Sequence, residues 1–328
     1  MRLFTNCRLS SVLVAALLLF AGSAPAAERA YDPLVLSDQS RPETLDFLVR
    51  DQARQRDIPL RVYLPPEKTP APVVLFSHGL GGCRADYAYL GRHWALRGYV
   101  VVFLEHRGSD GPLRKDDLPA PGSSREKRGA GARNFLLRVR DVSTVLDRLE
   151  QWNRSEGHAL TGRLDLGRIG IAGHSLGATT AQAVAGQAIS RGALSYVDPR
   201  VKAAIALSPG YPGRGRDPKE AFGSVKIPWM LMTGTRDGDV KSRMAVFVAL
   251  PPGGKYELVL SGAGHGVFTD RILPSERGKR RLDFHGTILA LSTAFWDAWL
   301  RGDGAARLWL DNDGPNSVLE KDDRWQRK

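Results

Sequence analysis

The sequence predicts an α/β fold with a mainly parallel central sheet flanked by helices. Apolar, β-branched segments alternate with amphipathic helical segments, and several of the former are hydrophobic on both faces, as buried parallel strands require. With 328 residues, of which 42% are hydrophobic, the chain can bury a sizeable core, which excludes a disordered protein. A chain with two cysteines is also not a disulfide-stapled miniprotein.

The first 26 residues have the layout of a secretory signal peptide. Two arginines give a positive start, Val12–Phe20 is apolar, and Ala24–Ala26 supplies small residues before a cleavage point. The apolar run is shorter than the roughly 20 residues of a membrane span, although an uncleaved anchor is an alternative. We expect cleavage after Ala26 or Ala27, export to the periplasm or extracellular space, and a single domain over residues 27–328.

Seven later segments have the composition of strands. They are rich in Val, Ile and Leu and are bounded by Gly, Pro or polar residues. In chain order they are Ile58–Leu64, Pro72–Ser77, Tyr99–Glu105, Arg168–Gly173, Val201–Leu207, Ile227–Thr233 and Tyr256–Leu260.

Helical patterns lie between these strands. Phe135–Leu149 repeats apolar residues every three or four positions, which predicts an amphipathic helix with Arg138 and Asp141 on its polar side. The Ala- and Gly-rich stretch Leu176–Ile189 suits a helix packed closely against a sheet. Two further helices are expected around Tyr87–Trp94 and Ile288–Trp299.

Three polar stretches are expected at the surface. Arg114–Arg133 and Pro209–Ser224 read as loops, neither of them long enough for a large lid over a site. The end of the chain, Asp311–Lys328, is polar and is expected to wrap the surface.

Gly173-His174-Ser175-Leu176-Gly177 has the spacing of a nucleophile elbow. It follows an apolar strand and opens a small-residue helix, so that the serine lies in a tight strand-to-helix turn where glycines relieve backbone crowding. This context favours Ser175 as a nucleophile over an incidental serine in a turn. The side chain of His174 is expected to point into the fold.

A serine nucleophile needs a base and an acid that orients the base. In this architecture they follow in the order acid, then histidine, each after a later strand. Asp237 follows the strand Ile227–Thr233, with Asp239 as the alternative acid. His265 lies in a glycine-rich loop after Tyr256–Leu260, with His285 as the alternative base.

Phe76–Gly82 predicts the loop that stabilises an oxyanion. A tetrahedral acyl-transfer intermediate needs preorganised backbone donors, one from the residue after the nucleophile and one from the loop after an earlier strand. The candidates are the N–H groups of Leu176 and Leu80. Glu105-His106-Arg107, after another strand, is expected to be salt-bridged, with the rim of the site as the alternative.

These segments together resemble the α/β-hydrolase superfamily, and within it platelet-activating-factor acetylhydrolases and dienelactone-hydrolase-like esterases. The resemblance is carried by FSHGLGG, YVVVFLEHR, IAGHSLG, TGTRD and GHGVF, between about Pro59 and Leu300. It implies an α/β-hydrolase catalytic domain and calcium-independent hydrolysis of acyl esters, with Ser175 as nucleophile, His265 as base and Asp237 as its orienter. A cutinase-like polyester hydrolase is less similar, because residue 174 is His and one cysteine remains after cleavage.

The sequence therefore predicts a secreted serine esterase that cleaves small-molecule or lipid-like esters. The alternatives are a serine peptidase or amidase, or a cutinase-like polyester hydrolase, on the same fold, and a non-catalytic binding protein. No paired histidines, Cys/His cluster or dinucleotide fingerprint is present, so we expect no metal and no organic cofactor.

The formal charge of +12 suggests a polyanion-binding protein, but no nucleic-acid recognition motif is found. Many basic residues gather in Arg125–Arg128 and Arg277–Arg281, away from the predicted site. We interpret them as solvated surface, with weak attraction to anionic surfaces as the alternative.

Overall fold

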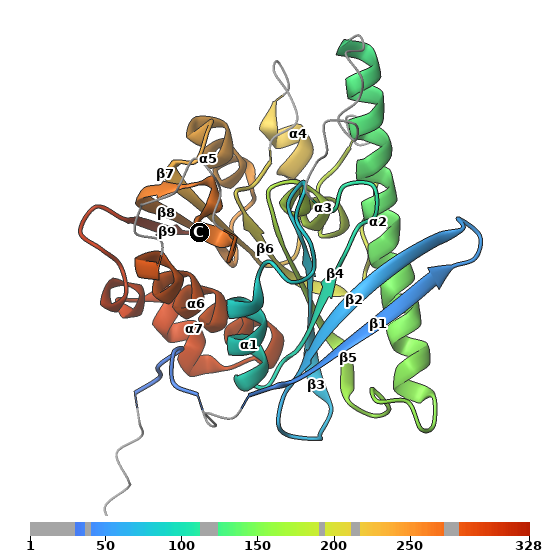
Figure 1. The fold of residues 1–328 in the computed structure, drawn as a ribbon. Helices are drawn as coiled ribbons and strands as arrows, with labels where there is room; N and C mark the ends of the chain where they lie inside the picture. The colour runs from blue at the N-terminus through green and yellow to red at the C-terminus, as the bar shows by residue number, and fades with distance from the viewer. Residues whose placement is uncertain (1–29, 37–40, 112–123, 190–193, 211–216, 272–281) are drawn as a thin grey trace, which may run out of the picture. The chain divides into compact units, whose positions relative to one another are not determined.

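A nine-stranded sheet runs through the described part of the chain (Figure 1), in the order β1-β2-β4-β3-β5-β6-β7-β8-β9. The strands from β3 to β8 are parallel to one another, whereas β2 and β9 run antiparallel to their neighbours in the sheet. This confirms the predicted mainly parallel sheet. The strands are β1 Glu43–Asp51, β2 Arg56–Leu64, β3 Ala71–Ser77, β4 Val100–Leu104, β5 Leu164–His174, β6 Val201–Leu207, β7 Trp229–Arg236, β8 Lys255–Gly264 and β9 Arg324–Arg327.

The computed structural model describes residues 30–36, 41–111, 124–189, 194–210, 217–271 and 282–328, with the backbone alone for 124–130 and 282–283. Tyr31–Lys328 forms one compact unit. The predicted signal peptide lies outside the described residues.

Helices cover both faces of the sheet (Figure 1). Apolar side chains of α1, α6 and α7 pack on one face, and those of α2, α3 and α5 pack on the other. Alternate residues of β3 point to opposite faces, and all seven are buried, which is why the strand reads as a continuous apolar run. The helices are α1 Ala88–Leu96, α2 Ser124–Arg154, α3 Leu176–Val184, α4 Pro218–Phe222, α5 Val240–Ala249, α6 Leu282–Trp296 and α7 Gly304–Asp311, with a π-helical turn at Asp297–Arg301.

The structure corrects the prediction for both edges of the sheet. Glu43–Asp51 was not predicted as a strand, yet it pairs with β2 along its whole length. The polar tail does not simply wrap the surface, because Arg324–Arg327 adds a strand to β8. An edge strand has one solvent-exposed side, so its composition is polar and its apolar signal is weak.

Two helix boundaries also differ from the predictions. The stretch Arg114–Arg133 is not loop throughout, because α2 begins at Ser124. The helix predicted over Leu176–Ile189 ends at Val184, since Gly186 has a φ of 128°, which a continuing helix cannot adopt. Pro218–Phe222 forms a short helix inside the second predicted loop, with Asp217 as its N-cap.

The amphipathic prediction for α2 was wrong at two positions. Arg138 and Asp141 were expected on the solvent side, but both side chains are fully buried. The middle of α2 is covered by the loops that follow β3 and β4, so its polar side faces protein rather than water. These two residues therefore belong to the interior of the fold.

Candidate active site

Ser175 lies in a strained turn between β5 and α3. Its φ and ψ are 57° and −116°, a conformation that non-glycine residues rarely adopt. A Cβ on Gly173 would lie 2.2 Å from the carbonyl oxygen of Gly177, and one on Gly177 would lie 1.8 Å from that of Ser77. Only glycine fits at both positions, so the spacing of the motif is a packing requirement. This is the geometry of a nucleophile elbow.

Asp237 follows β7 at the same edge of the sheet and is fully buried. Its Oδ2 accepts hydrogen bonds from Ser208 Oγ at 2.5 Å and Thr233 Oγ1 at 3.0 Å, while Arg243 Nη2 lies 3.2 Å from Oδ1. Burial by itself raises the pKa of Asp237, but hydrogen bonds from His265 and Ser208 and the charge of Arg243 outweigh it and lower the pKa to about 2. The carboxylate is therefore held ionised.

His265 follows β8 and is oriented by Asp237. Its Nδ1 lies 2.7 Å from Asp237 Oδ1. Because an ionised carboxylate only accepts, Nδ1 carries the proton of the neutral ring, which leaves Nε2 as an acceptor. The side chain is 38% exposed, so Nε2 can reach a substrate or nucleophile. The structure thus brings Asp237 and His265 together in the arrangement of an acid and a base.

The elbow approaches His265 through His174. The two rings have centroids 4.6 Å apart, and His174 Nε2 lies 3.0 Å from the carbonyl oxygen of His265. A carbonyl only accepts, so Nε2 donates and Nδ1 accepts from the Tyr87 hydroxyl at 3.0 Å. As predicted, His174 points into the fold. Within the described residues no hydrogen bond joins Ser175 to His265, a contact that often forms only when substrate binds.

The loop after β3 lies against the elbow. A Cβ on Gly79 would be 3.5 Å from Ser175 Cβ. Three glycine N–H groups of the loop have acceptors: Gly79 donates to Tyr87 Oη at 3.1 Å, Gly81 to Ser109 O at 2.9 Å and Gly82 to Gly79 O at 3.1 Å. Among the described residues the N–H of Leu80 has no acceptor, and neither has that of Leu176 at the start of α3. Two donors are thus available beside Ser175.

Ser208 is a site residue that the sequence analysis missed. It follows β6, has a φ of 55° and donates to Asp237. The signal was available, since a polar residue directly after a buried strand points to the same sheet edge as Ser175 and Asp237.

The alternative residues have other contacts. Asp239 caps α5 by accepting from the Ser242 N–H, and His285 stacks on Tyr89 with Nε2 3.0 Å from the carbonyl oxygen of Val267. Glu105 is paired with Arg84 at 2.7 Å, as the salt-bridge prediction required. His106 Nδ1 donates a hydrogen bond to Asp141 Oδ2 at 3.0 Å, from a ring that burial keeps neutral.

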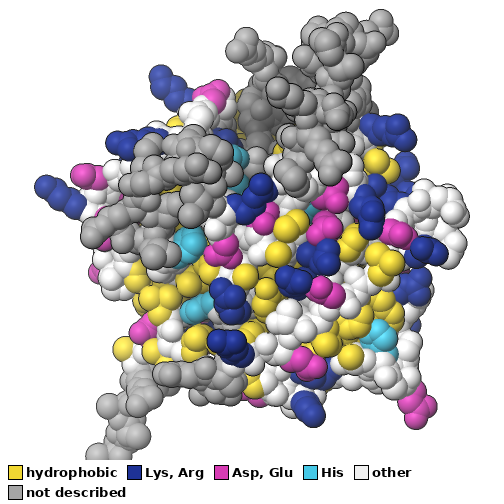
Figure 2. Space-filling model, in the orientation of Figure 1, with side chains coloured by type: hydrophobic (Ala, Val, Ile, Leu, Met, Phe, Trp, Pro, Cys, Tyr) yellow, Lys and Arg dark blue, Asp and Glu magenta, His cyan; other side chains and the backbone are white. Residues whose placement is uncertain are grey.

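Basic side chains on the visible face are interspersed with acidic ones (Figure 2). The predicted cluster Arg277–Arg281 lies outside the described residues, and Arg125–Arg128 is described only as backbone. In the described ranges no group of three or more His, Cys, Asp or Glu side chains could hold a metal ion, and no helix is both long and apolar enough to span a bilayer.

The sheet order, the helices on both faces and the elbow at the carboxyl edge define an α/β-hydrolase fold. A ferulic acid esterase from Streptomyces cinnamoneus shares this fold, with a TM-score of 0.59, 23% identity, and coverage of 84% of this chain and 94% of that one.

The resemblance to platelet-activating-factor acetylhydrolases is also confirmed. Residues 57–112 match the family described as platelet-activating factor acetylhydrolase, isoform II. A platelet-activating factor acetylhydrolase from Cavia porcellus is 28% identical over 163 residues, covering 42% of this chain. The match spans 35% of that relative's length.

Proposed function

We propose that this protein is an exported serine esterase that hydrolyses acyl esters through Ser175, His265 and Asp237. The observation that carries the proposal is the strained Ser175, whose neighbour His174 contacts His265, a histidine whose Nδ1 is held by a buried carboxylate. The named relatives support it, since they are acetylhydrolases and an esterase. Small-molecule or lipid-like esters are the proposed substrates.

The proposed reaction has two halves. His265 Nε2 takes the hydroxyl proton as Ser175 Oγ bonds to the ester carbonyl carbon, and the carbonyl electron pair moves onto oxygen. The N–H groups of Leu80 and Leu176 stabilise this oxyanion. Collapse breaks the bond to the alcohol, which receives the proton from His265. Water then attacks the acyl-enzyme in the same way, and the acid and free Ser175 are released.

Replacement of the nucleophile tests this function. Ser175→Ala is expected to lower turnover of p-nitrophenyl acetate by at least about ten-thousandfold and to abolish fluorophosphonate labelling, because both need an activated serine. A panel of esters from acetate to palmitate measures the acyl-chain preference. Undiminished turnover in folded Ser175→Ala protein would overturn the proposal.

The base is tested by a pair of histidine variants. His265→Ala is expected to lose activity, whereas His285→Ala, the matched control, keeps turnover within about threefold. Burial lowers the pKa of His174 to about 3 and of His106 to about 4, so both rings are neutral at pH 7 and neither competes with His265 for the proton of Ser175 by charge. Full turnover in folded His265→Ala protein would contradict His265 as the base.

Export is proposed from the first 26 residues. Expression of the full chain in a bacterium with a periplasm is expected to yield a protein that begins at Ala27 or Glu28. Fractionation and intact-mass measurement check this, and a retained N-terminus would contradict cleavage.

A further inference from the structure

Arg138 is a fully buried cation whose guanidinium contacts carbonyl and hydroxyl oxygens. It lies in the middle of α2 with no exposed surface, and among the described residues no carboxylate lies within ion-pair distance of it. Burial lowers its pKa to about 10, which leaves the guanidinium charged at neutral pH. The nearby Asp141 is already engaged by Arg54, Arg56 and His106. Burying an unpaired charge is costly, so its remaining contacts must compensate.

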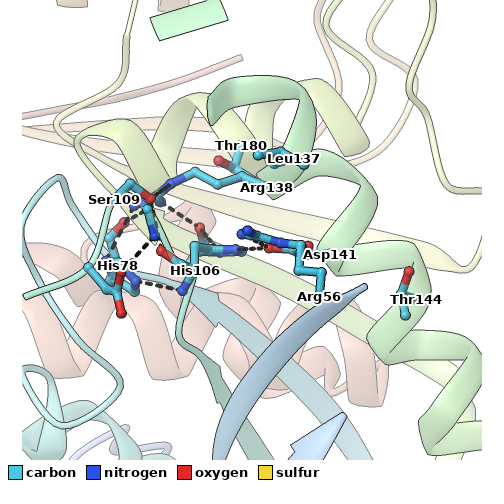
Figure 3. A network of polar contacts seen from close by, with 12 residues as sticks. Arg56, His78, His106, Ser109, Leu137, Arg138, Asp141, Thr144 and Thr180 are labelled. Atoms are coloured by element: carbon cyan, nitrogen blue, oxygen red, sulfur yellow. Dashed lines mark hydrogen bonds and ion pairs between the residues drawn. The ribbon is translucent and has the colours of Figure 1, made fainter. Parts of the chain in front are cut away.

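Those contacts go to the loop that carries Leu80 (Figure 3). Nη1 donates to the carbonyl oxygen of His78 at 2.6 Å, and Nη2 lies 3.4 Å from that of Gly79. Nε donates to Ser109 Oγ at 2.9 Å, which fixes the plane of the guanidinium. Hydrogen bonds from a charged donor are stronger than those between neutral groups. The charge is therefore directed at two consecutive peptide carbonyls.

The direction of the Gly79 carbonyl determines where the Leu80 N–H points. The Gly79 carbonyl and the Leu80 N–H belong to one peptide unit, and in a trans peptide they point in opposite directions. Drawing the carbonyl inward, toward Arg138, turns the N–H outward, away from Arg138. The preceding peptide is fixed in the same way, with its carbonyl on Arg138 and its N–H on Tyr87 Oη.

A second layer fixes the inward side of this peptide. His78 Nε2 accepts from the His106 N–H at 3.0 Å, so His78 Nδ1 carries the proton and donates to the Gly79 carbonyl at 2.6 Å. His106 in turn bonds Ser77 Oγ at 2.9 Å and Asp141 Oδ2 at 3.0 Å. Figure 3 shows this chain of contacts running from α2 to the loop. Burial lowers the pKa of His78 and of His106, so both rings are neutral and Arg138 is the buried cation that contacts this loop.

We propose that Arg138 is the positioning residue of the oxyanion loop: its guanidinium aims and polarises the Leu80 N–H toward the oxyanion formed at Ser175. This rests on the proposed esterase function. A cation at the carbonyl end of a peptide withdraws electron density and strengthens the N–H as a donor. The effect grows when negative charge develops on the substrate, so Arg138 acts on the transition state more than on bound ester.

The test compares Arg138→Met and Arg138→Lys with Arg140→Met, an exposed arginine of the same helix as the matched control. Fluorophosphonate labelling run to completion counts competent sites, so kcat is expressed per folded site. Arg138→Met is expected to lower kcat for p-nitrophenyl acetate about a hundredfold, with KM within about threefold. Arg138→Lys is expected to recover at least about tenfold of that loss, and Arg140→Met to match the wild type.

Inhibition by a boronic acid distinguishes a loss of oxyanion-loop positioning from a general loss of stability. Butylboronic acid forms an anionic tetrahedral adduct with an active serine, so its inhibition constant is expected to rise in Arg138→Met by a factor similar to the loss in kcat. If kcat per titrated site and the boronate inhibition constant are both unchanged in Arg138→Met, the proposal is overturned, even if this variant melts at a lower temperature.

One further variant keeps the result decisive. If Arg138→Met does not fold, Ser109→Ala removes the acceptor of Nε and is expected to lower kcat and boronate affinity three- to tenfold; no change in either would overturn the proposal. Failure of the esterase function has a different signature, because the wild type would then show no serine-dependent turnover or labelling. Wild-type turnover with an unaffected Arg138→Met defeats the positioning role alone.

Discussion

A charged network is buried at each end of the parallel strands, and the two networks differ in whether their cations are paired with a carboxylate. At the amino ends, Asp297 is buried against Arg97 at 2.9 Å and Arg301 at 3.6 Å. It also accepts from the hydroxyls of Tyr31 at 2.8 Å and Tyr99 at 2.6 Å. At the carboxyl ends, Arg138 has backbone carbonyls and hydroxyls for partners and no carboxylate within ion-pair distance in the described residues.

This difference separates a structural network from one suited to catalysis. In the Asp297 network both arginines are paired with a carboxylate, and the contacts join α1, β4 and the turn after α6, so the effect of this network is on stability. The Arg138 network leaves a cation whose field reaches the substrate edge of the sheet. The field of a paired cation is largely offset by its counter-ion, whereas the field of a cation held by carbonyl and hydroxyl dipoles is offset less.

The largest expected effect falls on the carboxyl end. Asp237→Asn is expected to lower kcat by about a thousand- to ten-thousandfold, because an amide no longer fixes the His265 tautomer or stabilises its charged form. The melting temperature should change little by comparison. Asp239→Asn is the matched control, since Asn caps a helix as well as Asp. Esterase assays per titrated site check both, and a larger loss in Asp239→Asn would reverse the assignment of the acid.

The next largest effect is expected from a substitution at the amino ends of the strands, and it should change stability but not turnover. Asp297→Asn leaves Arg97 and Arg301 without a carboxylate and is expected to lower the free energy of unfolding by about 2–4 kcal/mol, less than for fully buried partners because Arg301 is partly exposed. Turnover per titrated site should stay within about twofold. Urea unfolding measures the first quantity, with the α7 cap variant Asp303→Asn as control. A large loss of kcat at unchanged stability would erase the distinction between the two ends.

The smallest effect depends on pH and tests the layer behind Arg138. Burial raises the pKa of Asp141, but hydrogen bonds and charges from His106 and Arg56 outweigh it and lower the pKa to about 2. A carboxyl with a lowered folded-state pKa stabilises the fold above its ordinary pKa near 4, and this stabilisation is lost as pH falls through 2. The stability gap between wild type and Asp141→Asn should therefore narrow by about 1–2 kcal/mol between pH 6 and pH 2.5. A constant gap in urea unfolding would contradict this.

Sequence patterns predicted the parts of the site that local chemistry constrains. The elbow glycines are required by backbone contacts under 2.5 Å, so the motif around Ser175 could be recognised without a structure. Asp237 and His265 each follow a strand that is buried on both faces, and parallel strands bring their carboxyl ends to one edge. The bond between their side chains could be expected from that rule alone.

What the sequence could not supply depends on neighbours far along the chain. The edge strands β1 and β9 form because a partner strand offers unpaired backbone groups, a feature absent from their own composition. Helical periodicity places Arg138 and Asp141 opposite the apolar stripe of α2, but only the loops packed over that side decide that both are buried. By itself the sequence predicted the seven central strands with the helices between them, and it singled out Ser175, Asp237 and His265 as the residues proposed to react. Tertiary packing decided which charges are shielded from water, because burial is a property of the surroundings of a residue and not of its local pattern.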